Sequence, residues 1–419
     1  MNGTLAMVLA GGKGARLGPL TCHRAKPATP FGGRYRIIDF VLANFVNSGY
    51  RKVYVLTQYK ASSLIRHLAQ NWHLSGPGEF VEVAPAQMRT GEHWYRGTAD
   101  SVFQNLNLIR DVQPEQVAVF GGDHVYSCAV DQVDGHHRRV GADLTVAAFP
   151  VPRDEARDFG VIEVDADGRI TGFQEKPSNP RTIPGRPDTC LVSMGNYIFR
   201  ASVLTEALRE DNGDPKSRHD FGKDVIPRLL RQGRKLHIYD FSKNRIPGQN
   251  RETAPYWRDV GTLDGYFQAN MELRGPQPSL DLSNRRWRVR TAQRDYPPVR
   301  FIGAGVKLDD SLVAEGTVVE SAQVRRSLIG YDCRLRRGAQ VQDSLLMSGC
   351  SVGAGAIVRN VIADKDVRIA PGARIGLDPD EDRERFPCVT PAGRVVLPKG
   401  SFVPEQGPIE IPWDIAELL

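Results

Sequence analysis

The chain has 419 residues, of which 41% are hydrophobic and 25% charged, the composition of a globular protein with room for about two or three domains. No apolar run is long enough to cross a bilayer and no signal pattern opens the chain, so we expect a cytoplasmic protein without a membrane partner. The net charge of +6 comes from dispersed basic residues without a nucleic-acid-binding signature, which favours small anionic ligands over nucleic acid.

The chain begins with an apolar run of strand length, Thr4–Ala10, that leads into the glycine-rich turn Gly11–Gly14. Glycines let backbone N–H groups approach phosphate oxygens, and the following Arg16 and Lys26 add positive charge. The turn is not a P-loop, and the third glycine of a dinucleotide fingerprint is replaced by Leu17. A tight strand-to-helix connection is the simpler interpretation, but the two spaced cations favour a triphosphate site.

Strand and helix patterns then alternate, which predicts a three-layer α/β domain with a mainly parallel sheet. In such a sheet the ligand lies at the carboxyl ends of the strands, where the glycine turn also belongs. The expected strands are Lys52–Gln58, Gln116–Gly121, Leu144–Phe149, Tyr197–Phe199 and Leu236–Tyr239, and the expected helices are Ala61–Trp72, Asp100–Arg110 and Lys223–Arg231.

Two acidic residues are candidates for a metal site. Asp123 follows an expected strand directly, the usual place for a carboxylate that binds a metal beside phosphates, although a helix N-cap is the common alternative. Asp259 lies in a second polar string further along the chain. Together they could hold Mg²⁺ against a triphosphate, provided that the fold brings them together.

Two further segments have residues suited to a sugar phosphate and a base. Glu175 and Lys176 follow the strand-like Ile170–Gln174, where Lys176 could bind phosphate and Glu175 sugar hydroxyls; a surface ion pair is the alternative. The string Trp94–Asp100 combines aromatic residues with a Gly-Thr-Ala that could lie against a base. Its alternative interpretation is a capped helix with a hydrophobic staple.

The pattern changes near Gly275–Pro278, and after about Val299 aliphatic residues recur every six positions. This hexapeptide period predicts a parallel β-helix with three short strands per coil, which cannot close its own ends and therefore favours oligomer contacts. A β-sandwich with accidental spacing is the alternative. The in-phase triplets are Ile329, Leu335, Val341; Leu346, Val352, Val358; and Val361, Val367, Ala373.

Taken together, these segments resemble the glucose-1-phosphate adenylyltransferases over nearly the whole chain. The glycine turn is shared by all sugar nucleotidyltransferases, whereas Trp94–Asp100 and Tyr256–Thr262 are more specific to the adenylyl branch. Other matching strings are Arg24–Ala28, Phe31–Gly33, Tyr35–Phe40, Thr57–Tyr59, Pro85–Gln87, Gly122–His124, Phe159–Gly160, Glu175–Pro177, Ser193–Gly195 and His219–Gly222.

The resemblance implies an allosteric homotetramer that converts ATP and glucose 1-phosphate to ADP-glucose and diphosphate for α-glucan synthesis, with Mg²⁺. It implies a Rossmann-like nucleotidyltransferase domain over residues 1–275, a linker over 276–300, and a left-handed β-helix for oligomerisation and regulation over 301–419. The implied catalytic residues are Arg16, Lys26 and Asp123; the glucose 1-phosphate ligands Tyr95, Gly160, Glu175, Lys176 and Ser193; the nucleotide ligands Gly11, Gly12, Gln87, Gly97 and Thr98; and the metal ligands Asp123 and Asp259.

For phosphorylated effectors the resemblance implies a basic loop near the N-terminus together with the β-helix. His23 and Pro30 depart from the pattern of enteric relatives, which argues against fructose 1,6-bisphosphate as activator. The remaining candidates for anion binding are His23, Arg24, Arg36, Arg383 and Arg385, and a solvated basic face is their alternative interpretation.

Three other functions compete with this one. The first is the same chemistry with another nucleotide or sugar phosphate, because a few contacts set such a preference. The second is a non-catalytic regulatory subunit, which the presence of Arg16, Lys26, Asp123 and Lys176 disfavours. The third is an acyltransferase site in the β-helix, which would need a histidine base, whereas the last histidine is His237, before the repeat begins.

Overall fold

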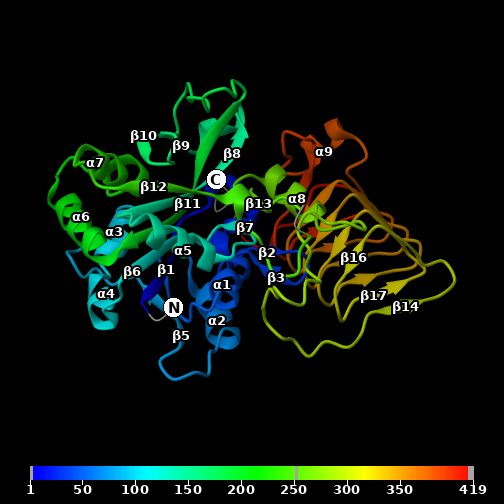
Figure 1. The fold of residues 1–419 in the computed structure, drawn as a ribbon. Coiled ribbons are helices and arrows are strands. Elements are labelled where there is room, and N and C mark those ends of the chain that lie inside the picture. Colours follow the sequence, from blue (N-terminus) through cyan, green and yellow to red (C-terminus); the bar gives the residue numbers. More distant parts are fainter. Residues whose placement is uncertain (1–2, 251–252, 414–419) are drawn as a thin grey trace.

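The computed structural model describes residues 3–250 and 253–413 and shows an α/β domain with a β-helix at its side (Figure 1). The first apolar run forms β1 (Thr4–Ala10), an interior strand of a nine-stranded sheet. β1 is parallel to β4 (Lys52–Thr57) and to β6 (Gln116–Gly121), and β5 (Phe80–Pro85) adds to β4 in the same direction. The carboxyl ends of these strands therefore meet at one edge, as expected.

The other half of the sheet adds antiparallel pairs to the expected parallel ones, so the sheet as a whole is mixed. Strand β11 (Thr189–Arg200) runs antiparallel to β6, to β8 (Leu144–Pro152) and to β9 (Gly160–Val164). A register shift between Ser193 and Tyr197 lets this long strand continue, so it extends well beyond the expected Tyr197–Phe199. The sheet is completed by β10 (Ile170–Glu175), paired with β9, and β12 (Leu236–Asp240), paired with β8.

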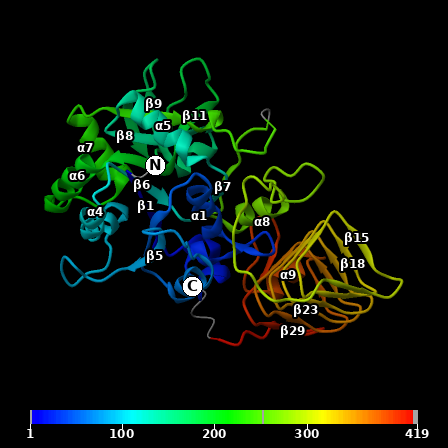
Figure 2. The same ribbon diagram turned by 60° about the horizontal axis from the view of Figure 1, so that its bottom comes forward.

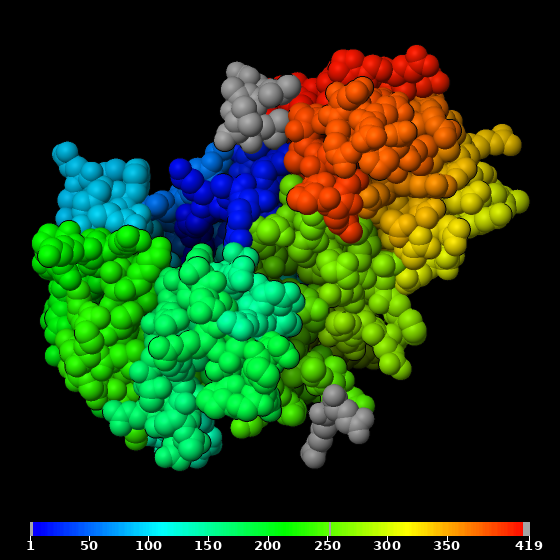
Figure 3. Space-filling model, turned by 90° about the horizontal axis from the view of Figure 1, so that it is seen from above, coloured from blue at the N-terminus to red at the C-terminus, as the bar shows by residue number. Residues whose placement is uncertain are grey.

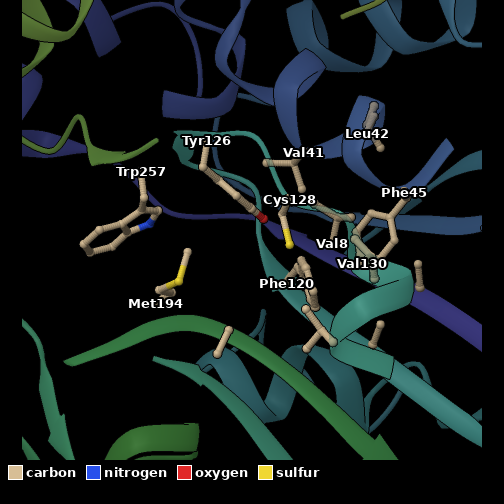
Figure 4. Packing of buried hydrophobic residues seen from close by; sticks show 14 of the residues in the cluster. Val8, Val41, Leu42, Phe45, Phe120, Tyr126, Cys128, Val130, Met194 and Trp257 are labelled. Atoms are coloured by element: carbon tan, nitrogen blue, oxygen red, sulfur yellow. The ribbon is translucent and has the colours of Figure 1, made fainter. Parts of the chain in front are cut away.

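Helices cover both faces of this sheet, which confirms the three-layer α/β architecture. Alternate residues of β1 point to opposite faces, so Ala6 and Val8 join one apolar core while Leu5 and Met7 join the other. Figure 4 shows the first core around Val8. Its helices are α1 (Ile37–Asn47), α2 (Ser62–Asn71) and α5 (Val130–Val140), and those of the second core are α3 (Thr98–Phe103), α4 (Leu106–Val112), α6 (Ala201–Gly213) and α7 (Ile226–Arg231).

Two of the expected helices differ in detail. The helix expected over 100–110 is interrupted between α3 and α4, where the Asn105 side chain donates hydrogen bonds to the Ser101 carbonyl and to the Tyr95 hydroxyl. The helix expected over 223–231 begins earlier, with the π-helical turn η4 (Phe221–Val225) before α7. No helix in the described ranges is both long and apolar enough to span a membrane.

The C-terminal part is a parallel β-helix of three sheets, consistent with the left-handed form that hexapeptide repeats adopt (Figures 1 and 2). The first sheet contains β14 (Arg300–Ile302), β17 (Val318–Glu320), β20 (Arg334–Leu335), β23 (Ser351–Val352), β26 (Arg368–Ile369) and β29 (Phe402–Val403). The second contains β15 (Lys307–Asp309), β18 (Gln323–Arg325), β21 (Gln340–Gln342), β24 (Ile357–Arg359) and β27 (Arg374–Ile375). The third contains β16 (Leu312–Val313), β19 (Leu328–Ile329), β22 (Leu345–Leu346), β25 (Val361–Ala363) and β28 (Val395–Leu397).

The hexapeptide triplets are confirmed in part. The first two are in register, since Ile329 pairs with Leu346 and the members that follow each of them also pair. The third triplet stands two residues before the paired positions, because Leu346 pairs with Ala363 and not with Val361. The expected Val361, Val367 and Ala373 are nevertheless fully buried, each two residues before the position that pairs.

The β-helix packs on the α/β domain through an apolar cluster and buried charges. The cluster joins Leu17 and Leu20 of the 3-10 helix η1 (Ala15–Thr21) to Leu345 and Ile362 of the β-helix, with α8 (Leu263–Met271) between them. Figure 3 shows the N-terminal residues in blue, recessed between the α/β domain in cyan and green and the β-helix in orange and red. The segment after the glycine turn therefore lies at the junction of both domains.

Candidate active site

A cleft of ≈ 710 Å³ lies at the carboxyl edge of β1, β4 and β6, where the sequence predicts the ligand site. Its lining contains most of the predicted site residues: Gly11, Gly12, Arg16, Lys26, Tyr95, Gly97, Thr98, Asp123, Glu175 and Lys176. It also contains residues to which the sequence assigned no role, among them Gln58, Tyr197, Asp220 and Phe221. Asp220 and Phe221 belong to the string His219–Gly222, which matches the family but to which the sequence assigned no function.

The glycine turn brings the backbone close to Lys26. Gly14 has a left-handed backbone with φ of 65°, and a Cβ atom placed on it would lie 2.8 Å from the Cβ of Lys26. A side chain at this position would therefore be strained in both backbone and contacts. The turn continues into η1, and Lys26 itself begins the short 3-10 helix η2 (Lys26–Ala28).

The fold brings Asp123 and Asp259 together around Lys26. The amine of Lys26 lies 3.0 Å from Asp123 Oδ2 and 3.1 Å from Asp259 Oδ1. Asp259 reaches this place because β13 (Trp257–Asp259) pairs antiparallel with β7 (His124–Tyr126) and sets Asp259 opposite His124. The chain thus joins carboxylates that are far apart in sequence at one cation.

The electrostatics of this cluster follow from its contacts. Burial works against the charged form of Lys26, yet Asp123 and Asp259 outweigh it and raise the pKa of the amine. Burial also works against the charged form of Asp123, but Lys26 and His124 hold its pKa well below the usual range. Arg16 is more exposed and lies 3.9 Å from Asp259. The site is a charged, salt-bridged cluster at neutral pH.

The two carboxylates fit a divalent cation only together with ligand oxygens. In the described ranges no group of three or more His, Cys, Asp or Glu side chains could hold a metal ion. Mg²⁺ commonly takes one or two protein carboxylates and completes its shell with water and substrate phosphates. Asp123 and Asp259, which already share one cationic partner, match that requirement.

The opposite side of the cleft contains Glu175 and Lys176. Glu175 ends β10, and its partner in β9 is Gly160, where an added Cβ would lie 3.0 Å from Glu175 Oε2. Burial raises the pKa of Glu175, and Asp220 adds to this effect. Lys176 is exposed and has a left-handed backbone with φ of 50°, an uncommon conformation that is often found at functional sites.

Tyr95 is fixed in the cleft by two side chains. Its backbone N–H donates to Gln58 Oε1 at 2.6 Å, and its hydroxyl accepts a hydrogen bond from Asn105 at 2.8 Å. Gln58 belongs to the wall of the cleft, so the polar groups around Tyr95 connect α4 with the end of β4.

Four predicted ligands do not line the cleft, namely Gln87, Gly160, Ser193 and Asp259. Gln87 is exposed and accepts a hydrogen bond from Arg89. Ser193 is buried, and its hydroxyl accepts from the N–H of Gly195, which itself lines the cleft. Asp259 contacts the amine of Lys26, which does line the cleft. Gln87 is therefore the predicted ligand whose exposed position fits the cleft least well.

The predicted effector residues fall into two groups. Arg24 is buried and pairs with Asp364 of the β-helix at 2.9 Å, and Arg36 donates to the Ser63 carbonyl at 2.7 Å. Burial lowers the pKa of Arg36 to about 10; Asp39 opposes this, whereas Arg24, Arg294 and Arg66 add to it. The exposed His23 stacks edge-on against Trp413, with 4.6 Å between ring centroids.

The sequence missed a lysine in this cationic cluster. Burial, followed by the charges of Arg36 and Arg24, lowers the pKa of Lys365 to about 7. Lys365 is separated from Arg24 by most of the chain, so no local pattern connects the two. Together, Arg24, Arg36, Arg294 and Lys365 define what we call the junction cluster.

Arg383 and Arg385 behave differently, on α9 (Pro379–Arg385). Arg383 pairs with the exposed Asp380 one turn earlier. The guanidinium of Arg385 donates to the carbonyls of Arg374, Pro404 and Gly407, and so fixes a loop of the β-helix. Within the described ranges, no hydrogen bond or ion pair joins either arginine to the junction cluster.

The chain is similar to known proteins over nearly its whole length. The family model described as nucleotidyl transferase matches residues 5–275, and that described as GlmU-like, C-terminal hexapeptide matches residues 297–397. Glucose-1-phosphate adenylyltransferase 1 of Vibrio vulnificus (strain YJ016) is 48% identical over 407 residues, covering 96% of this chain and 100% of that protein. The glucose-1-phosphate adenylyltransferases of Anaeromyxobacter sp. (strain Fw109-5) and Corynebacterium jeikeium (strain K411) are 48% and 45% identical, covering 95% and 96% of this chain and 98% and 99% of theirs.

Proposed function

The chain belongs to the glucose-1-phosphate adenylyltransferase family of nucleotidyl transferases, and from this premise we propose that it makes ADP-glucose and diphosphate from ATP and glucose 1-phosphate. Its product would serve as a glucosyl donor for glycogen or related α-glucans. The observation that carries the proposal is the Lys26 amine, at 3.0 and 3.1 Å from two carboxylates beside a glycine turn in the main cleft.

The reaction requires positioning and charge neutralisation more than proton transfer. A phosphate oxygen of glucose 1-phosphate attacks the α-phosphorus of ATP, the new P–O bond forms, and the bond to the leaving diphosphate breaks in line. Because the attacking phosphate is already an anion, no general base is needed. Catalysis then depends on holding the two substrates in line and on stabilising the charge that develops on phosphate oxygens.

We assign the triphosphate to the glycine-turn side of the cleft. Gly11 and Gly12 would present backbone N–H groups to it, while Arg16 and Lys26 would neutralise its oxygens. Mg²⁺, when bound by Asp123 and Asp259, would supply further positive charge to the same phosphates. The adenine would lie toward Gly97 and Thr98, with Gln87 as a further ligand.

We assign glucose 1-phosphate to the opposite side. Lys176 would bind its phosphate, Glu175 would accept hydrogen bonds from sugar hydroxyls, and Tyr95 would contact the ring. Gly160 and Ser193 complete this set: the close approach at Gly160 leaves room for Glu175, and Ser193 supports the turn at Gly195.

Regulation and assembly are part of the same proposal. A phosphorylated metabolite would bind the junction cluster, where Arg24, Arg36 and Lys365 concentrate positive charge between the domains. We propose a homotetramer in the cytoplasm, where ATP is available. The division into a nucleotidyltransferase domain at 1–275, a linker at 276–300 and a β-helix at 301–419 remains a prediction, as do His23, Arg383 and Arg385 as effector ligands.

The test is diphosphate release by the purified protein with Mg²⁺ and glucose 1-phosphate, measured with ATP, UTP, dTTP, CTP and GTP in turn. A strong preference for ATP is the expected result. Activity with another nucleotide would keep the chemistry and change the product. No activity with any nucleotide, in the presence and absence of sugar-phosphate effectors, would refute the enzyme and favour a regulatory subunit.

A further inference from the structure

One wall of the cleft is built from two segments that are distant in sequence. Gly97 and Thr98 come from the start of α3, and Asp220, Phe221 and Gly222 from the turn before α7. The Thr98 hydroxyl donates to Asp220 Oδ2 at 3.1 Å and accepts from the Phe221 N–H at 3.0 Å. This hydroxyl therefore joins the two segments where both face the cleft.

The second joint between the segments is the carbonyl of His219. It accepts hydrogen bonds from the N–H groups of Ala99 at 2.8 Å and Asp100 at 3.4 Å, and so caps free donors at the start of α3. The contact is tight, since a Cβ atom on Gly97 would lie 2.2 Å from the His219 oxygen. The position of this carbonyl thus decides where the two halves of the wall meet.

The backbone of His219 has an uncommon conformation, and several contacts stabilise it. Its φ of 57° lies in the left-handed region, which is uncommon for residues other than glycine, although asparagine, aspartate and histidine adopt it more often than most. The holding contacts come from outside the cleft. The side-chain Nδ1 of His219 lies 2.9 Å from Asp211 Oδ2 in α6. The backbone N–H of His219 donates to the Ser217 hydroxyl, and this hydroxyl donates to Asp211 Oδ1.

This anchor is buried and charged. His219 is 6% exposed and Asp211 is 2% exposed, and Arg228 approaches Asp211 to 3.6 Å. A buried carboxylate with several donors keeps a fixed geometry, because losing one contact leaves a costly unpaired group. The anchor therefore transmits the rigid position of α6 to a loop that ends in the cleft.

We propose that His219 is a positioning residue of the enzyme: held by Asp211 and Ser217, its backbone fixes the Asp220–Gly222 part of the wall against the sugar phosphate, while Thr98 joins this part to the nucleotide side. The inference rests on the proposed function. The sugar side is affected first, because Gly222 approaches Glu175, where an added Cβ would lie 2.5 Å from Glu175 Oε2. The nucleotide side depends on α3, which is also packed into the second apolar core.

Three substitutions separate the side-chain anchor from the backbone conformation. His219→Asn keeps both, because asparagine tolerates φ > 0 and its Nδ2 stands as many bonds from Cβ as Nδ1 of histidine. His219→Gly keeps the conformation and loses the anchor. His219→Ala loses both. Should a histidine variant fail to fold, Ser217→Ala removes one hydroxyl of the same network and is the milder probe.

We expect His219→Gly and His219→Ala to raise KM for glucose 1-phosphate about tenfold, with kcat within about threefold of wild type. KM for ATP should change by less than about threefold, and His219→Asn should stay within about twofold of wild type in all constants. Ser217→Ala should raise the sugar-phosphate KM only about threefold, because the contact between His219 and Asp211 remains.

The matched control is His137→Gln, a buried histidine that contacts Thr145 and Gln116 on the other side of the sheet. It should lower the thermal midpoint and leave KM unchanged. If His219→Gly folds and keeps the wild-type KM, or if His219→Asn is as impaired as His219→Ala, the positioning role is refuted. A wild-type protein inactive on ATP and glucose 1-phosphate would instead refute the proposed function.

Discussion

Replacing Asp123 by asparagine removes one of the two carboxylates around the Lys26 amine and leaves the shape of the side chain unchanged. Lys26 then keeps Asp259 at 3.1 Å, so its buried charge retains a partner. The fold should therefore survive, and the thermal midpoint should stay close to that of wild type. The change removes one negative charge that would help to hold Mg²⁺ against the triphosphate.

The magnitude follows from the number of ligands that remain. Asp123 and Asp259 both contact the Lys26 amine, and under the proposed roles the variant keeps one of these two carboxylates for Mg²⁺. Losing one preorganised electrostatic stabiliser typically lowers kcat by roughly 10²–10³, about 2.7–4 kcal/mol in the activation free energy. Asp123→Ala should lower kcat by at least as much, because it also leaves an empty space in place of the side chain.

The assay is diphosphate release at saturating ATP and glucose 1-phosphate over a series of Mg²⁺ concentrations. The control is Asp158→Asn, because Asp158 lies 3.9 Å from Arg16 but its side chain is 70% exposed. Exposed ion pairs contribute little, so we expect kcat within about twofold of wild type.

A second comparison tests whether the carboxylates share one ion. If they do, Asp123→Asn combined with Asp259→Asn should lose far less activity than the product of the two single losses, because residues acting as a unit are not additive. Turnover by Asp123→Asn within about tenfold of wild type at saturating Mg²⁺ would refute the role of Asp123 and the reasoning behind it.

Three further outcomes are expected. Lys176→Ala should raise KM for glucose 1-phosphate by roughly 10- to 100-fold with kcat nearly unchanged, as steady-state kinetics would show, since a charged hydrogen bond to substrate is lost uniformly; an unchanged KM would return Lys176 to a surface role. Burial and neighbouring arginines lower the pKa of Lys365 to about 7, so Lys365 loses its charge as pH rises through this value. An anion at the junction cluster should therefore bind more weakly above about pH 7. In effector titrations, Lys365→Met should make this binding less dependent on pH. Asp364→Asn should destabilise the protein by about 3–5 kcal/mol in unfolding experiments, because Arg24 is left buried without its charged partner, whereas Arg383→Ala, at an exposed pair, should cost less than about 1 kcal/mol.

Local patterns predicted the parts of the fold that depend on local chemistry. The run Thr4–Ala10 and the glycine turn after it are specified by adjacent residues, so the strand and its place at the cleft could be predicted. The break near Asn105 could not, because it depends on a side-chain hydrogen bond to the Tyr95 hydroxyl. The helical periodicity of the sequence continues from α3 into α4 and therefore does not reveal the break.

Register in the β-helix shows a different limit. Val361 and Ala363 are both small, apolar and fully buried, so the sequence cannot decide which of them pairs with Leu346. The choice depends on the stacking of the neighbouring coil. The first two triplets were predicted because a large aliphatic residue stands at every pairing position.

Site residues were predictable where a motif ends a strand and less so elsewhere. Asp123 and Lys26 were found from local strings, but their meeting at Asp259 depends on the pairing of β7 with β13. Lys365 was missed because its neighbours Arg24 and Arg36 belong to the other domain. Gln87 is predicted by the resemblance alone, and it is exposed and lies outside the cleft lining.

A single residue, Ala25, separates the β-helix contact of Arg24 from the cleft contact of Lys26. Residues two apart in a chain lie within about 7 Å of each other. A shift of the β-helix must therefore break the Arg24–Asp364 pair or move the Lys26 amine relative to Asp123. The two domains are consequently not interchangeable modules. Cutting the chain at the predicted linker, or exchanging the β-helix for that of a relative, should also alter the segment that presents Lys26 to the cleft.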